Sequence, residues 1–325
     1  MPKIVAPQDI VGILPPLATP LSADESVDER ALEAMAGFML AQGVDGLVVG
    51  GSSGEGFNLE ADELRRITAT VAGVMGDRGP LIAGVIANST RAAVAKAKAV
   101  ADLGVSALQV TPVHYIYKTD DESMIRHFRE IHEACGLPII VYNVVPWNYL
   151  SPALILRMMR EVPGVYGVKQ SAGDLKQLAD LLLGAAPGNR IYGAVDSLLY
   201  PCIALGAHGL ISMLTSAAPR QCIALWRAVK EGDHDRAKAL HAKLLTLWNA
   251  IFADNRIATF KYALELQGLE VGACRRPTLP ATDRQKGAIR AAMADLMGAW
   301  ARAPASAPAA AGNPSGTAGP RTAPA

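Results

Sequence analysis

The chain has 325 residues, and its 31 lysines and arginines against 30 aspartates and glutamates leave a formal net charge of +1. Half of the residues are hydrophobic, so the chain can bury a large core, and a wholly disordered protein is excluded. The balanced charge excludes a strongly basic nucleic-acid-binding protein and provides no electrostatic attraction to anionic membranes. The four cysteines are scattered, in a pattern typical of neither a disulfide framework nor a zinc site.

The two ends of the chain give separate indications. The first residues lack the apolar segment of a secretory signal, and every apolar run is too short to span a bilayer. We therefore expect a soluble, cytoplasmic protein. Residues 302–325 are mostly Ala, Pro, Gly, Ser and Thr, which predicts a disordered tail because such a segment buries too little apolar surface to offset its ordering entropy.

Between the ends, short apolar runs alternate with helix-like segments. The predicted strands are Gly12–Pro20, Gly46–Gly51, Leu81–Ala87, Ala107–Pro112, Pro138–Asn143, Val165–Gln170, Arg190–Val195 and Gly209–Ser212. The predicted helices that follow them are Asp28–Gln42, Ala61–Met75, Thr90–Leu103, Asp121–Ala134, Pro152–Glu161, Leu175–Leu183, Ser197–Leu205 and Ala217–Glu231. Apolar strands joined by helices are typical of a parallel sheet buried on both faces. Eight units predict an α/β fold, a closed (β/α)₈ TIM barrel. A doubly wound open sheet is the alternative, but no G-x-G-x-x-G follows the first strand.

Three more helices are predicted after the eighth unit, at Asp235–Ala253, Arg256–Leu266 and Asp283–Ala299. They exceed what a minimal barrel needs, so we expect a C-terminal three-helix extension packed against its side. The expected organisation is a barrel carrying the active site at residues 1–232, the extension at 233–301 and the tail at 302–325.

A lysine in the sixth strand is the first candidate for chemistry, since the active site of such a barrel lies at the carboxyl ends of its strands. Alternation puts Lys169 on the same face as Val165 and Gly167. If that face is the barrel interior, the amine is desolvated and becomes a competent Schiff-base nucleophile. The alternative interpretation is a strand-end lysine that reaches solvent.

Two further strand ends carry polar groups. The second strand runs into Gly51-Ser52-Ser53-Gly54-Glu55, which can form a backbone nest for a carboxylate or phosphate, or simply a tight turn that needs glycine. The fifth strand ends in Tyr142-Asn143, where a tyrosine can pass a proton or be a core residue with a satisfied hydroxyl.

Taken together, six motifs support a family resemblance. They are Gly12–Pro20, Gly51–Glu55, Tyr142-Asn143, Gly167–Asp174, Gly193–Asp196 and Gly206–Ser212, in this order and at barrel spacing. With them the chain resembles the dihydrodipicolinate synthase / N-acetylneuraminate lyase family of pyruvate-dependent class I aldolases, from about Val11 to about Arg302. In the fourth motif, Gln170 replaces the family's usual acid.

The resemblance implies roles for the matching residues. Lys169 would form an imine with pyruvate or another 2-oxo acid, and Tyr142 would relay protons. Ser52 and Ser53 would bind the carboxylate, one of them also bonding to Tyr142, and we take Ser53 as the catalytic hydroxyl. The other substrate-binding residues are Gly51, Gly193, Ile211, Tyr115 and Trp147. We expect no metal and no cofactor, because the protonated imine is itself an electron sink. The expected partners are small-molecule substrates and three further copies of the chain, in a homotetramer built as a dimer of dimers.

Two loops depart from the family pattern. The run from Tyr142 to Tyr149 lacks the arginine that in dihydrodipicolinate synthases grips the acceptor carboxylate, and Trp147 and Tyr149 suggest a bulkier, less anionic acceptor. After the fourth strand, His114, Tyr115 and Tyr117 each could take the role of a tyrosine that reaches a neighbouring subunit.

Four functions follow from these observations. The first is an aldolase or lyase that makes or breaks a carbon–carbon bond between pyruvate and an aldehyde. The second is a 2-keto-3-deoxy sugar acid dehydratase that uses the same imine, and the third is 4-hydroxy-tetrahydrodipicolinate synthase. A non-catalytic 2-oxo acid binding protein is the alternative from a different class.

Overall fold

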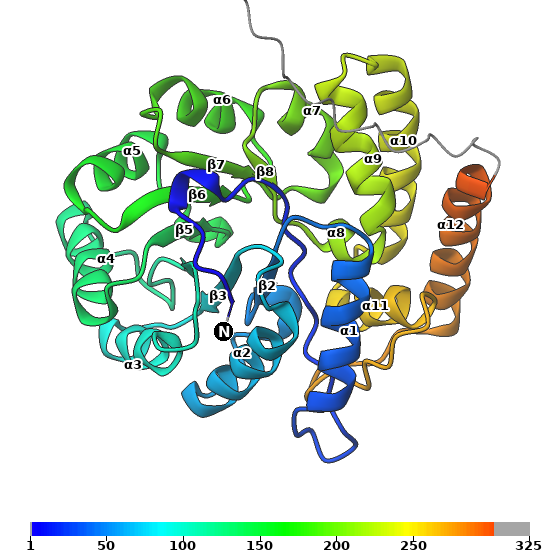
Figure 1. The fold of residues 1–325 in the computed structure, drawn as a ribbon, viewed down its shortest axis with the longest axis horizontal. Coiled ribbons are helices and arrows are strands. Elements are labelled where there is room, and N and C mark those ends of the chain that lie inside the picture. The colour runs from blue at the N-terminus through cyan, green and yellow to red at the C-terminus, as the bar shows by residue number, and fades with distance from the viewer. Residues whose placement is uncertain (1, 302–325) are drawn as a thin grey trace, which may run out of the picture.

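The computed structural model describes residues 2–301, so the predicted tail, residues 302–325, lies outside the described residues. Eight parallel strands form one sheet in the order β1-β8-β7-β6-β5-β4-β3-β2 (Figure 1). They are β1 (Gly12–Ile13), β2 (Leu47–Val49), β3 (Leu81–Val85), β4 (Ala107–Val110), β5 (Ile139–Asn143), β6 (Val165–Gln170), β7 (Arg190–Gly193) and β8 (Gly209–Leu210). A parallel bridge between Pro16 and Val48 joins the segment after β1 to β2. The sheet is thereby closed, which confirms the predicted (β/α)₈ barrel.

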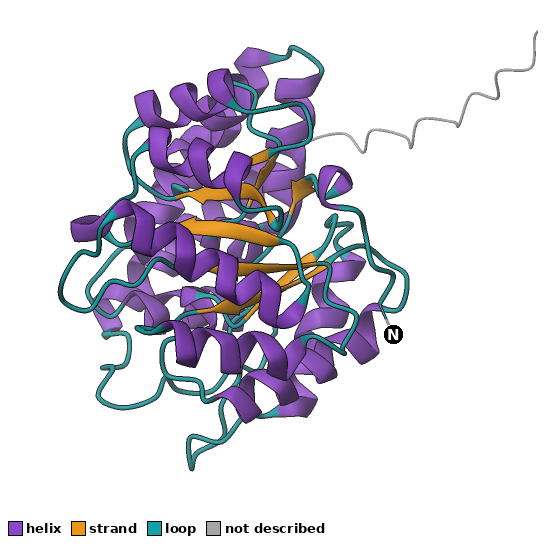
Figure 2. Cartoon of the chain, turned by 90° about the vertical axis from the view of Figure 1, so that its left-hand side faces the viewer, coloured by secondary structure: helices purple, strands orange, loops and turns teal. Residues whose placement is uncertain are grey.

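The helices of the barrel surround the strands (Figure 2). They are α1 (Glu29–Ala41), α2 (Ala61–Met75), α3 (Thr90–Val100), α4 (Asp121–Cys135), α5 (Pro152–Glu161), α6 (Leu175–Gly184), α7 (Leu199–Ala204), α8 (Met213–Ala217) and α9 (Pro219–Lys230). Side chains cap the first turns of several of them, as when Asp28 accepts the Ala31 N–H at α1 and Ser151 accepts the Leu154 N–H at α5. The helix predicted at 217–231 is α9, which begins at Pro219, and a separate short helix, α8, lies before it.

The apolar core has two layers. The inner layer fills the barrel with side chains from all around the ring, namely Ile10, Leu14, Val48, Ile82, Ala107, Ile140, Tyr166, Tyr192 and Ile211. The outer, larger layer packs the strands against the helices. The Tyr192 hydroxyl donates to the Ile10 carbonyl at 2.8 Å, which ties the N-terminal segment to this inner layer. The barrel is therefore a filled core, and chemistry is left to its carboxyl end.

Strand β6 does not follow the simple alternation that the sequence suggested. Its pairing with β5 jumps from Ile139–Val165 to Ile140–Gly167, so one extra residue, Tyr166, is accommodated as a bulge. Val165 consequently packs in the outer layer and Tyr166 in the inner one. The prediction that Val165 shares a face with Lys169 is wrong for this reason, although Lys169 does face the interior end of the barrel.

The C-terminal extension consists of α10 (His234–Ile251), α11 (Arg256–Glu265) and α12 (Asp283–Ala301). Helix α10 packs against α9 and α12, on the flank of the barrel, as expected. Helix α11 packs against α8 and reaches the loop after β2, where Lys261 forms a buried ion pair with Glu55 at 2.9 Å. The extension thus covers part of the carboxyl end of the barrel as well as its side.

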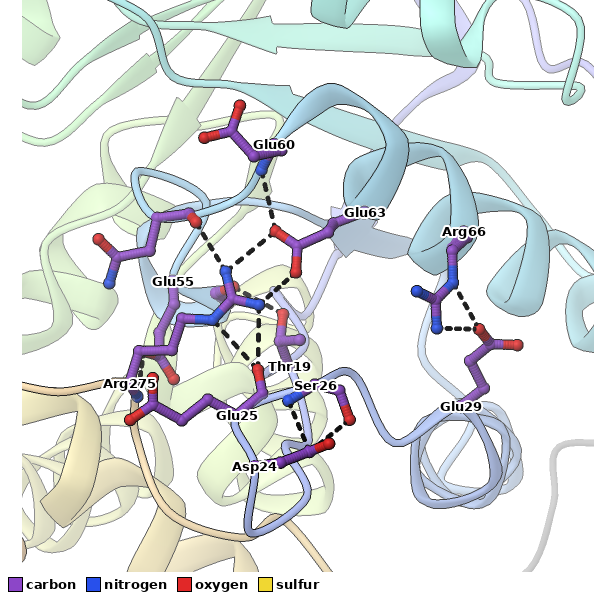
Figure 3. Close-up of polar contacts among 12 residues, drawn as sticks. Thr19, Asp24, Glu25, Ser26, Glu29, Glu55, Glu60, Glu63, Arg66 and Arg275 are labelled. Carbon is purple, nitrogen blue, oxygen red and sulfur yellow. Dashed lines mark hydrogen bonds and ion pairs between the residues drawn. The ribbon is translucent and has the colours of Figure 1, made fainter.

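The loop after α11 reinforces that contact (Figure 3). The Arg275 guanidinium bonds to the Glu63 carboxylate and to the Glu25 carbonyl, and its backbone N–H donates to Glu55. These contacts fix the extension to the segments that follow β1 and β2. No helix within residues 2–301 combines the length and apolar character needed to cross a membrane.

Candidate active site

A cavity of about 400 Å³ opens at the carboxyl ends of the strands. Its wall comes from the ends of β5, β6, β7 and β8, from the loop after β2, and from the extension. The lining residues are Ser52, Ser53, Tyr142, Val144, Pro146, Tyr149, Lys169, Ser171, Gly173, Ala194, Val195, Asp196, Ser197, Ile211, Ser212, Met213, Trp248, Phe252 and Arg256. Two other cavities of similar volume, around Met293 and around Tyr262, contain no residue from a strand end.

The centre of the site is a lysine beside a tyrosine. Tyr142 and Lys169 are direct neighbours in the pairing of β5 with β6, so their side chains leave the sheet on the same side. The Lys169 side chain is 4% exposed, and its Nζ lies 3.9 Å from the centroid of the Tyr142 ring. Among the described residues no carboxylate forms an ion pair with Lys169, so its amine is free to react with a ligand in the cavity.

The serine loop lies opposite the tyrosine. The Tyr142 hydroxyl donates to the Ser52 hydroxyl at 3.1 Å, whereas Ser53 is buried and also lines the cavity. We expected Ser53 to be the catalytic hydroxyl, but the serine linked to Tyr142 is Ser52. Neighbouring Gly51 adjoins the site without lining it, and its carbonyl accepts the N–H groups of Gly54 and Gly56.

Close backbone packing explains the glycines of this loop. Gly50 has a φ of +63°, and a Cβ on Gly56 would overlap the Gly50 carbonyl oxygen. Thr19, in the segment after β1, donates to the Gly54 carbonyl at 2.6 Å. Glu55, the next residue, is anchored by Lys261 from α11. The tight-turn interpretation therefore describes the backbone, and the turn also presents two hydroxyls to the cavity.

The residue that departs from the family pattern in β6 has a structural partner. Gln170 is buried, and its side-chain oxygen accepts from the Asn143 amide at 2.9 Å. Asn143 in turn bonds to the backbone of Leu150 through both its amide and its oxygen. This neutral network holds the loop after β5, in which Tyr149 lines the cavity. Burial raises the pKa of Tyr149, so its hydroxyl stays protonated.

A buried acid, Asp196, is among the polar residues that line the cavity. Asp196 follows β7, lines the cavity and accepts the Leu214 N–H at 2.8 Å. Burial raises the pKa of Asp196 to about 6, while the charges of Lys169 and Arg256 act in the opposite direction. The carboxylate is therefore mostly ionised at pH 7 and takes up a proton at about pH 6.

This titration predicts a pH dependence. A cation at Lys169 is stabilised by the Asp196 carboxylate and loses that stabilisation when the acid is protonated. We expect kcat/KM to fall as the pH drops through about 6, and the Asp196→Asn variant to lack this inflection. Rates measured from pH 5 to 8 test it. An unchanged inflection in the variant would assign the titration to another group.

Besides Gly51, three predicted substrate residues do not line this cavity. Trp147 is 58% exposed and its indole N–H donates to the His114 carbonyl at 2.9 Å, while Tyr115 is 71% exposed. The Cβ side of Gly193 faces Cys202 on α7, and Gly193 is not part of the cavity lining. Ile211 does line the cavity, and its N–H donates to the Gly193 carbonyl. Of the two aromatic residues that we expected near the acceptor, Tyr149 lines the cavity and Trp147 does not.

Part of the cavity lining comes from the extension. Trp248 at the end of α10, Phe252 after it and Arg256 at the start of α11 all line the cavity. We expected the whole active site within residues 1–232, and these three residues lie beyond it. The sequence offered a weak signal, since aromatic residues and an arginine at four-residue spacing would share one helical face. Nothing in the sequence indicated that this helical face packs at the carboxyl end of the barrel.

Comparison with known proteins places these features in a family. The model of the dihydrodipicolinate synthetase family matches residues 9–296. A 4-hydroxy-tetrahydrodipicolinate synthase from Symbiobacterium thermophilum is 37% identical over 286 residues, covering 87% of this chain and 97% of the relative. One from Ralstonia nicotianae is 34% identical over 289 residues, covering 88% and 97%.

Solved structures of similar proteins agree with this family assignment. Dihydrodipicolinate synthase from Bacillus anthracis superposes with a TM-score of 0.83 at 27% identity, covering 88% of this chain and 98% of that one. The Clostridium difficile protein CdNal, solved in complex with mannosamine, gives a TM-score of 0.82 at 26% identity, covering 89% and 99%.

Within residues 2–301, no group of three or more His, Cys, Asp or Glu is arranged so that it could hold a metal ion. The family match spans nearly all of the described residues and includes both the lysine strand and the serine loop. The chain therefore belongs to the dihydrodipicolinate synthetase family, and it is a lyase of the class I aldolase type.

Proposed function

We propose that the protein forms a Schiff base between Lys169 and the ketone of pyruvate or another 2-oxo acid, and uses it to make or cleave a carbon–carbon bond to an aldehyde. The observation that carries this proposal is the buried Lys169 amine beside Tyr142, whose hydroxyl bonds to Ser52 in the same cavity. Nucleophile, proton carrier and hydroxyl come from three different strand ends and meet in one cavity.

The proposed reaction begins with attack of the Lys169 amine on the ketone carbon, and loss of water leaves a protonated imine. Ser52 and Ser53 hold the 2-oxo acid carboxylate through hydroxyl and backbone N–H groups. Tyr142 donates its proton to the departing water, and the resulting phenolate removes a proton from the methyl carbon. The imine accepts the electron pair that this leaves, which gives an enamine. The enamine carbon attacks the aldehyde, Tyr142 passes a proton to the new alkoxide, and water releases the product from Lys169.

Two other activities use the same imine. The printed names of the relatives support 4-hydroxy-tetrahydrodipicolinate synthase as one candidate. The loop after β5 lacks the arginine expected of that activity, so we propose it as an alternative rather than the conclusion. A 2-keto-3-deoxy sugar acid dehydratase is the other alternative. It is distinguished by its product, a dehydrated keto acid with an unchanged carbon count.

We also propose a cytoplasmic homotetramer built as a dimer of dimers. The loops after β4 and β5 expose Tyr115, Ile116, Tyr117 and Trp147, and the Trp147–His114 hydrogen bond joins them into one patch. Exposed aromatic clusters of this kind are typical of protein interfaces. We expect light scattering to give the mass of four chains, and the Tyr117→Asp variant to give a smaller species. A monomeric wild type would contradict this proposal.

Borohydride trapping tests the proposed function. Wild-type protein is incubated with pyruvate, reduced, and read by intact mass and peptide mapping. We expect one pyruvyl group, located on Lys169. The absence of an adduct on folded protein would overturn the imine proposal and favour the non-catalytic binding protein. An adduct on a different lysine would retain the chemistry but refute the site.

A further inference from the structure

Arg256 is a charged residue of the cavity that the proposed reaction does not use. It begins α11, and its guanidinium packs on Phe252, with Cζ 4.2 Å from the ring centroid, and on Trp248 at 5.6 Å. It lies near enough to Asp196 and Tyr142 to be coupled electrostatically to both. Arg256 is therefore held beside the reacting centre by its packing against these two aromatic side chains.

The Arg256 guanidinium has N–H donors that no acceptor within residues 2–301 satisfies. Among the described residues, no carboxylate lies within ion-pair distance of Arg256, and its Nε is buried without a hydrogen-bond partner. The two aromatic contacts do not satisfy these N–H groups with a conventional acceptor. A buried donor without a partner calls for an explanation, and a ligand that arrives in the cavity would supply one.

We propose that Arg256 binds a carboxylate of the second substrate, so that the aldehyde acceptor, or the far end of the cleaved 2-oxo acid, is anionic. This inference rests on the proposed function and names its substrate class. A planar guanidinium fits a carboxylate through two parallel hydrogen bonds, which a lysine cannot provide. Asp196 nearby makes the wall unfavourable to a second negative charge, which favours a single carboxylate over a phosphate dianion.

This proposal differs from our expectation of a less anionic acceptor. That expectation was based on the loop after β5, where no arginine follows Tyr142. The cavity nevertheless contains an arginine, supplied by α11 from the other side. The acceptor carboxylate would then lie against the extension rather than against the loop after β5.

Matched aldehyde pairs test the proposal. One pair is glyoxylate and glycolaldehyde, and the other is succinic semialdehyde and 4-hydroxybutanal, each differing by a carboxylate against a hydroxymethyl group. We expect wild type with pyruvate to prefer the carboxylate member of at least one pair by about tenfold or more in kcat/KM. Arg256→Gln should abolish that preference. Arg220→Gln, an exposed arginine at the start of α9, is the matched control and should keep it.

Trapping separates this inference from the proposed function. Arg256→Gln should still form the pyruvyl adduct on Lys169, because pyruvate is held by the serine loop. If no aldehyde turns over, the reduced pyruvyl enzyme is titrated calorimetrically with both members of each pair. The preference is then the ratio of the Kd values of the two members. A preference that persists in Arg256→Gln, or no preference in wild type, would overturn the role of Arg256. Loss of the adduct in wild type would instead overturn the imine.

Discussion

The Lys169→Ala variant is expected to lose the pyruvyl adduct completely and to lose kcat/KM by at least about 10⁴-fold, because no other group in the cavity can form the imine. The truncation removes a buried amine that has no ion-pair partner among the described residues, so the fold should be retained. Circular dichroism and thermal melting check that retention, and steady-state kinetics with borohydride trapping measure the loss.

A second variant separates imine formation from proton transfer. Tyr142→Phe keeps the ring beside Lys169 but removes the hydroxyl that bonds to Ser52. We expect this variant to form the adduct and to lose about 10²- to 10⁴-fold in kcat, the range typical of a general acid–base residue. Near wild-type turnover in Tyr142→Phe would mean that the Tyr142 hydroxyl is only structural. Adduct formation by Lys169→Ala would refute the assignment of the nucleophile.

The buried ion pair between Lys261 and Glu55 yields the largest expected effect on stability. Both side chains are at most 2% exposed, and they join α11 to the serine loop at 2.9 Å. Lys261→Met leaves the Glu55 charge buried without its partner, which costs about 3–5 kcal/mol in the free energy of unfolding. Because the same loop presents Ser52 and Ser53, we also expect KM for pyruvate to rise. Urea denaturation and steady-state kinetics measure the two effects.

Two control variants test whether burial of the Lys261–Glu55 ion pair is the reason for the expected loss of stability. Lys243→Met breaks an exposed ion pair with Asp295 and should cost only about 0–1 kcal/mol. The double variant Glu55→Gln/Lys261→Met removes both charges and keeps an acceptor for the Arg275 N–H, so it should be more stable than Lys261→Met alone. Equal losses in Lys261→Met and Lys243→Met would contradict a special role for the buried pair.

Much of the architecture can be predicted from short contiguous segments of the sequence. Apolar strands followed by amphipathic helices predict the barrel, since each element needs only its own periodicity to be recognised. The motifs at strand ends then place Lys169, Tyr142 and the two serines at one face of the molecule. The lysine strand also illustrates the limit of this reasoning. Alternation misplaced Val165, because a bulge arises from pairing with β5 and leaves no local mark in the sequence of β6.

The sequence by itself therefore determined the fold class and singled out Lys169 and Tyr142, which lie side by side in the structure. Only the tertiary structure decided which serine bonds to Tyr142 across 90 residues, and that Trp147 stays outside this cavity while Trp248, Phe252 and Arg256 enter it. The physical reason is that these contacts depend on how the barrel closes and where the extension docks. Such packing is fixed by many weak contacts between distant segments, and no single stretch of sequence encodes it.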